Sequence, residues 1–305
     1  MNLKGRNLTK SGKLINLLMM NKNWLKFTLK IIISAICLYY VFTKIDFIPF
    51  FNLLKTVRIF WLALATIFFI LSKIIGAFRL NIYLKNAEIN LTEKENLKLY
   101  WLGMFYNLFL PGGIGGDAYK IILLKKHFNK SYKTISTAVL LDRISGLVAL
   151  IGLAIISACF IPLSKWYLIL VIISFFSGYT VYRFILFRYF ATHRQNILKT
   201  DLLGLMVQLS QGFSIICIAF ALSTAQNFAV LLVIFYISSL STLLPLSVGG
   251  LGAREIIFLF SAKYLGIPQE VSVSISLVFY MISALVSLVG VYFVFGRMFS
   301  DKVDD

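Results

Sequence analysis

The sequence has few of the residues that build catalytic and metal centres. It contains two histidines, three cysteines and 12 acids among 305 residues. Cys37, Cys159 and Cys217 lie far apart in apolar stretches, as small hydrophobic residues do. His127 and His193 stand in basic connections without a Cys or Glu cluster. A metal site, a Ser-His-Asp triad and a nucleotide P-loop therefore have little support, and we expect no cofactor and no enzymatic activity.

Polar surface is also scarce, since only 14% of the residues are charged and 59% are apolar. That composition cannot cover a soluble domain of this size, so a bilayer must be the solvent. Apolar stretches near the ~20 residues that cross a hydrocarbon core occur at 25–42, 59–78, 136–160, 166–182, 202–223 and 271–295. Two more, at 100–110 and 228–244, run into Pro and Gly and resume beyond them. The sequence predicts an all-α polytopic membrane protein with about six spanning helices and two broken or re-entrant segments.

Acids are outnumbered by 30 Lys and Arg residues, which gives a net charge of +18. These cations lie mainly between apolar stretches, so we expect no nucleic-acid partner. Seven of them precede or begin the first stretch without an acid, which places the N-terminus in the cytoplasm and the chain in the cell membrane. We divide the chain into a basic cytoplasmic tail over 1–24 with an interfacial helix at 14–20, one transmembrane domain over 25–299, and a short tail over 300–305.

The two interrupted stretches contain an internal repeat. Residues 111–120 read PGGIGGDAYK, and residues 245–254 read PLSVGGLGAR. They share Pro, a β-branched residue, Gly-Gly and a final cation at matching positions. Proline removes an amide donor and glycine lowers helix propensity, so both segments should break their helices at membrane depth.

The basic connections predict how the two breaks face each other. If 100–126 dips in from the cytoplasm and returns, the basic connections 79–98 and 120–133 stay inside. Three spans follow, so the second break dips in from the opposite face and the repeat is inverted, as in many transporters. The alternative, full spanning by 100–126, would place the lysines of 125–133 outside.

The breaks are also candidate anion sites. Where a helix restarts after Gly116 or Gly250, its free amides and dipole favour an anion such as a phosphate, and Lys120 or Arg254 follows one turn later. Ionisable residues in spans cost ~2.5 to 3.5 kcal/mol each, so they are functional candidates. The candidate substrate-binding residues are Asn107, Gly112, Gly113, Gly115, Gly116, Asp117, Lys120, Asp142, Arg143, Gly249, Gly250, Gly252, Arg254 and Glu255.

A second interpretation of these charges is that acids and bases pair to hold helices together, for example Arg254 with Glu255. Lys30 and Lys73 lie near the ends of predicted spans, where they can reach the interface, and receive no role. Arg79 closes a span on the cytoplasmic side, where it can meet lipid headgroups.

The chain resembles the lysylphosphatidylglycerol synthase transmembrane region, a flippase-like family, over about 24–299. The resemblance rests on Asn107 with 111–117, on Asp142-Arg143, and on Pro245 with 249–255. In the multiple peptide resistance factors this region resembles the lipid-flipping half, joined to a cytosolic lysyl transferase. Only six residues follow Phe299, so we expect no transferase here. The resemblance implies flipping of an anionic phospholipid or of a polyprenyl-phosphate-linked substrate.

Two alternatives stay open. One is a membrane-embedded lipid-modifying enzyme with Asp117, Asp142 or Glu255 as base. The other is a non-catalytic subunit that partners a separate lipid or glycan synthase through the basic tail, and a homo-oligomer is also compatible with the sequence. The lipid, the direction of transport and the energy source are not specified by any motif.

Overall fold

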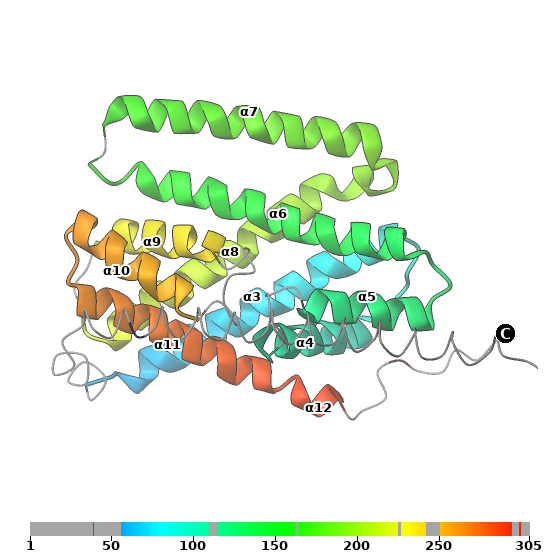
Figure 1. Ribbon diagram of the computed structural model, residues 1–305, viewed down its shortest axis with the longest axis horizontal. Coiled ribbons are helices and arrows are strands. Elements are labelled where there is room, and N and C mark those ends of the chain that lie inside the picture. Colours follow the sequence, from blue (N-terminus) through cyan, green and yellow to red (C-terminus); the bar gives the residue numbers. More distant parts are fainter. Residues whose placement is uncertain are drawn as a thin grey trace, which may run out of the picture.

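The computed structural model describes residues 56–109, 115–162, 164–224, 227–241 and 251–294, together with Tyr39 and Phe299. These residues form helices joined by short connections, which confirms the all-α class (Figure 1). The helices are α3 (Ile59–Asn86), α4 (Glu93–Phe109), α5 (Gly115–His127), α6 (Tyr132–Ala158), α7 (Lys165–Tyr189), the 3-10 helix η1 (Ala191–Asn196), α8 (Ile197–Ala221), α9 (Phe228–Ser241), α10 (Ala253–Leu265), α11 (Gln269–Leu288) and α12 (Val291–Val294).

Within the described ranges, five helical stretches are long and apolar enough to cross a membrane. They are Ile59–Asn86, Tyr132–Ala158, Lys165–Tyr189, Thr192–Ala221 and Gln269–Val294. They match five of the six predicted spans. The first predicted span, 25–42, lies outside the described residues, as does the tail over 1–24.

Side-chain caps fix several helix starts. Thr92 and Glu95 form a capping box at α4: the Glu95 carboxylate accepts the Thr92 amide proton at 2.9 Å, and the Thr92 hydroxyl accepts that of Glu95 at 3.3 Å. The Ser131 hydroxyl accepts the Thr134 amide at the start of α6. At the other terminus, α10 ends at Gly266, whose φ of 73° is left-handed. The polar connections thus define where the apolar helices begin and end.

Helices α3 and α8 form the antiparallel centre of the bundle and define its two ends. At one end the Arg58 amide donates to the Ala221 carbonyl at 2.8 Å. At the other end the Asn196 side chain donates to Asn86 at 2.9 Å. We call these the Arg58 end and the Asn86 end. One buried apolar cluster, which includes Phe69, fills the Arg58 half, and a second cluster fills the Asn86 half.

The first interrupted segment is a helical hairpin that enters from the Asn86 end. The α5 helix doubles back and packs closely against α4. Gly116 lies so close to Gly103 that a methyl group on Gly116 would overlap the Gly103 carbonyl. Just beyond α5, Lys130 forms an ion pair with Glu88, which follows α3. The segment therefore does not span fully, which was the alternative interpretation.

The second interrupted segment is a hairpin that enters from the Arg58 end. Helix α9 follows α8 after a short connection, and α10 packs against α9. Ile267, which follows α10, joins the same apolar cluster as Leu222 and Ile161 at the Arg58 end. Figure 1 shows the α4–α5 and α9–α10 hairpins in opposite halves of the bundle. The predicted inverted arrangement is present.

Helix α7 stands apart from this core. It lies along α6 on the outside of the bundle (Figure 1). Leu186 is its one buried residue, so α7 presents apolar side chains outward on almost every face. Its polar anchor is Asp201 in α8, whose carboxylate accepts the Tyr179 and Tyr182 hydroxyl protons at 3.0 and 3.3 Å.

Candidate functional site

The first break is built from a side-chain cap and a close helix contact. The Asn107 Oδ1 atom accepts the Gly116 amide proton at 2.8 Å, so α4 supplies the cap for α5. Helix α5 begins at Gly115. Asn107 and Gly116 therefore hold the hairpin closed, while Gly112 and Gly113 lie outside the described residues.

The carboxylate of Asp117 forms ion pairs with both cations near this break. Its Oδ1 atom accepts from Lys120 Nζ at 3.1 Å, and its Oδ2 atom accepts from Arg143 Nε of α6. Asp117 and Lys120 are each 6% exposed. The Lys120 ammonium also lies 4.8 Å from the centre of the Tyr100 ring. At this break the charges are arranged as the pairing interpretation predicts.

A second buried ion pair joins α3 to α6. Arg79 Nε donates to Asp142 Oδ1 at 2.7 Å, and both residues are buried. Methyl groups on Gly146 or Gly204 would lie about 3 Å from the guanidinium, so both glycines leave space for it. The prediction that Arg79 meets lipid headgroups at the end of a span is wrong, because α3 continues to Asn86.

The second break differs from the first in its backbone. Gly252 has φ +87°, which side chains with a Cβ rarely adopt, and α10 begins only at Ala253. Arg254 is thus the second residue of the helix and not one turn beyond its start, which corrects the prediction. Gly249 and Gly250 lie outside the described residues.

Both carboxylate oxygens of Glu255 are used in hydrogen bonds. Oε2 accepts the Gly252 amide proton at 2.6 Å, and Oε1 accepts the Ser276 hydroxyl proton of α11 at 3.0 Å. Glu255 is fully buried. It therefore stabilises the start of α10 and ties α10 to α11, and the predicted ion pair with Arg254 is not formed.

Arg254 has no acid partner among the residues that the structure describes. Its Nε is buried without a hydrogen bond, and its Cζ lies 4.9 Å from the Phe279 ring centre and 5.7 Å from that of Phe235. The positive end of the α10 dipole adds to its charge. This cation therefore lies against aromatic rings without an ion pair, and Glu255 acts on it only through space.

Lys73 is a second cation of this kind, and the sequence interpretation missed it. It lies halfway along α3 and is half-buried, so its expected position near the end of a span is wrong. Its Nζ lies 4.4 Å from the Phe69 ring centre and within electrostatic range of Arg254 and Arg79. Leu80, Tyr83 and Leu84 continue the buried face of α3 beyond Arg79, and this apolar continuation was the available signal.

Most of the chain matches a known protein family. The model of the lysylphosphatidylglycerol synthase TM region matches residues 27–290, which include both breaks and all the charged residues above. The chain belongs to this family. The prediction that the chain is a membrane protein of this family is thereby confirmed.

An individual membrane protein is also similar to part of this member of the lysylphosphatidylglycerol synthase TM region family. It is a UPF0104 membrane protein of Pyrococcus horikoshii, 32% identical over 102 residues. The alignment covers 33% of this chain and 30% of the archaeal protein. This chain therefore matches less than a third of that relative's length.

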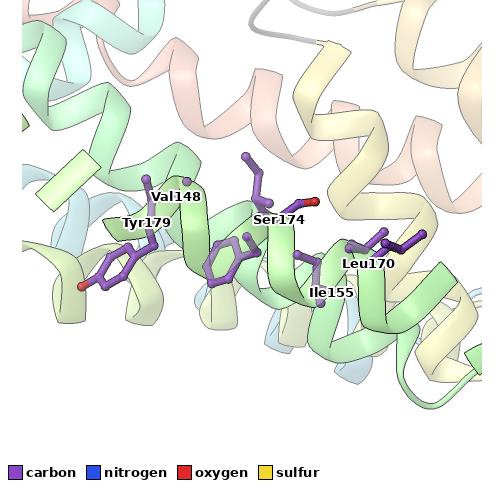
Figure 2. A pocket seen from close by; sticks show the side chains of 9 residues that line it. Val148, Ile155, Leu170, Ser174 and Tyr179 are labelled. Carbon is purple, nitrogen blue, oxygen red and sulfur yellow. The ribbon is translucent and has the colours of Figure 1, made fainter. Parts of the chain in front are cut away.

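The family member also has an apolar groove between α6 and α7, which is separate from the charged residues. The groove has a volume of about 500 Å³ and is lined by Val148, Ile155, Leu170, Ser174 and Tyr179, among others (Figure 2). None of its lining residues is charged. Among the described residues, no three His, Cys, Asp or Glu side chains gather as they would around a metal ion.

Proposed function

We propose that this chain translocates an anionic phospholipid or a lipid-linked phosphate between the leaflets of the cell membrane. The observation that carries the proposal is Arg254. This arginine stands at the N-terminus of a half-length helix within the bundle and has no acid partner among the described residues.

The energetic argument is that a cation without an ion pair in this environment is stabilised by an anionic ligand. A charge at membrane depth costs ~2.5 to 3.5 kcal/mol on insertion scales. Lys120 and Arg143 offset this cost by pairing with Asp117, whereas Arg254 relies on the faces of two phenylalanines. A phosphate oxygen would supply both the missing charge and an acceptor for Nε. The family name, which refers to a phospholipid, agrees with a lipid as the source of that phosphate.

The distribution of basic residues supports one orientation in the membrane. Among the described residues, the Asn86 end holds ten Lys and Arg residues, namely Lys85, Lys94, Lys98, Lys125, Lys126, Lys130, Lys133, Arg188, Arg194 and Lys199. The described part of the Arg58 end holds three, namely Arg58, Lys165 and Lys263. The positive-inside rule then places the Asn86 end in the cytoplasm.

Reconstitution into liposomes tests the proposal. Arg254→Gln should abolish the movement of a labelled anionic phospholipid between leaflets while the protein still folds. Arg254→Lys should keep part of the rate, because the charge remains but the bidentate fork is lost. The matched control is Lys263→Gln, an exposed cation on the same helix, which should leave the rate unchanged.

Two results would contradict the proposal. An Arg254→Gln protein that moves the anionic lipid at the wild-type rate would remove Arg254 from the site. Chemically altered lipid, detected by mass spectrometry after incubation with purified protein, would favour a membrane-embedded enzyme instead.

A further inference from the structure

Lys73 and Arg254 lie on one continuous cluster of phenylalanine rings. The Phe69 and Phe279 rings pack edge to face with centres 5.4 Å apart, and Phe279 contacts Phe235 at 5.0 Å. Lys73 lies over Phe69, and Arg254 lies over Phe279. Three helices, α3, α9 and α11, supply these rings and so bring the two cations into electrostatic range of each other.

Nearby acids are already committed to other partners. Asp142 pairs with Arg79, and Glu255 accepts hydrogen bonds from Gly252 and Ser276. Lys73 forms no ion pair with any residue in the described ranges, and neither does Arg254. Residues 242–250, which directly precede this region in the sequence, contain no acid. Two like charges thus lie close together without an ion pair among the described residues, and Glu255 offsets the charge of Arg254 only through space.

Such a pair lowers the stability of the empty protein, because like charges in a medium of low polarity repel strongly. The aromatic faces offset only part of this cost, since a cation–π contact is weaker than an ion pair with a buried carboxylate. An arrangement of this kind is stabilised when one ligand binds both cations. A ligand with two negative charges satisfies both at once.

We infer that Lys73 and Arg254 together bind a phosphate monoester headgroup of a lipid. This inference rests on the proposed function and narrows its substrate. A phosphate monoester carries about −1.5 to −2 charges near neutral pH, whereas a phosphodiester headgroup carries a single negative charge. Arg254 provides the planar fork for two phosphate oxygens, and Lys73 provides a point charge for the third. Phe69 and Phe279 form an apolar wall beside the headgroup.

Binding measurements on the full-length protein in detergent test the charge match. The probes are dihexanoyl phosphatidic acid as monoester, dihexanoyl phosphatidylglycerol as diester, and glycerol phosphate as a soluble monoester. Wild type should prefer phosphatidic acid to phosphatidylglycerol by about tenfold or more. Lys73→Gln should weaken binding of phosphatidic acid by about tenfold and leave phosphatidylglycerol nearly unchanged, so that the preference disappears. Lys73→Arg should retain the preference, and Lys85→Gln on the same helix serves as the control.

Melting temperatures without ligand separate a binding role from a structural one. If Lys73 and Arg254 repel each other in the empty protein, Lys73→Gln should melt at a higher temperature than wild type while it binds phosphatidic acid less tightly. A lysine that merely stabilises the fold would give the opposite shift in melting temperature. A lower melting temperature for Lys73→Gln together with unchanged ester preference would overturn the inference.

The remaining outcomes distinguish this inference from the proposed function. If wild type binds both lipids equally and translocates them, the charge match is wrong and translocation stands. If glycerol phosphate binds as tightly as phosphatidic acid, the assignment to a lipid is overturned. If neither lipid binds nor crosses the bilayer, the proposed function itself fails.

Discussion

The two hairpins contain matching sequences but differ in whether the cation of the repeat forms an ion pair. In the α4–α5 hairpin, the seventh position of the repeat is Asp117, which neutralises Lys120 three residues later. In the α9–α10 hairpin, the same position is Leu251, and Arg254 three residues later forms no ion pair within the described residues. The repeat cation of the first hairpin is therefore paired within the hairpin, and that of the second is not.

The two hairpins also cap their returning helices differently. The amide of Gly116 in α5 is bonded to Asn107, a neutral side chain from the preceding helix. The amide of Gly252 before α10 is bonded to Glu255 of α10 itself. Glu255 keeps its charge in these bonds and acts on Arg254 through space, but it forms no ion pair with Arg254 in the described structure. A repeated backbone plan can thus provide a fixed hairpin and a ligand-binding hairpin through a few side-chain changes.

The largest expected effect concerns the inversion on which this comparison depends. Single cysteines at Lys130 and Asn227, in a protein without Cys37, Cys159 and Cys217, should react with a membrane-impermeant reagent from opposite sides of the membrane. The reason is that Lys130 lies at the Asn86 end and Asn227 lies at the Arg58 end. Reaction of both from the same side would refute the inverted arrangement.

The next effect is on stability at the first hairpin. Asp117→Asn leaves Lys120 and Arg143 without their shared carboxylate, and breaking a buried pair in this way costs about 3 to 5 kcal/mol. We expect a large fall in melting temperature, partly restored when Lys120→Gln is added. Glu270→Gln on α11 is the control. An unchanged melting temperature for Asp117→Asn would show that the first hairpin does not need its charge balance.

A smaller effect should follow from making the second hairpin resemble the first. Leu251→Asp places a carboxylate three residues before Arg254, the same spacing as Asp117 to Lys120. The new pair should neutralise Arg254 and reduce lipid translocation by about tenfold, with little loss of stability. Leu251→Asn, which has similar size without charge, is the matched control. Equal transport by the Asp and Asn variants would mean that the charge of Arg254 is not what the lipid requires.

The smallest effect is expected at the exposed base of the first hairpin. The ion pair with Lys130 holds the pKa of Glu88 below its usual range. A lowered carboxyl pKa stabilises the folded state above the unfolded-state pKa, and this contribution is lost as the pH falls through the folded-state value. Lys130→Ala should therefore melt only slightly below wild type at neutral pH, and the two curves should converge in acid. A difference that grows in acid would contradict this assignment.

Much of this architecture could be predicted because bilayers impose simple lengths and charge rules. Apolar stretches located the described spans, and the Pro-Gly repeat located both interruptions. Ion pairs between residues far apart in the sequence were harder to predict. Arg79 and Asp142 are 63 positions apart, and only packing of α3 against α6 brings them together. Lys73 was missed because the predicted span stopped at Phe78, although apolar residues continue after Arg79.

The solitary position of α7 makes this protein responsive to the thickness of the membrane. The apolar stretch of this helix, 166–182, ends before Arg183 and extends about 25 Å at 1.5 Å per residue, which is less than the ~30 Å hydrocarbon core. Since protein contacts cover so little of α7, this mismatch must be relieved by local thinning of the bilayer or by flanking side chains that reach the interface. A thicker bilayer therefore increases the mismatch at α7, and a thinner one relieves it.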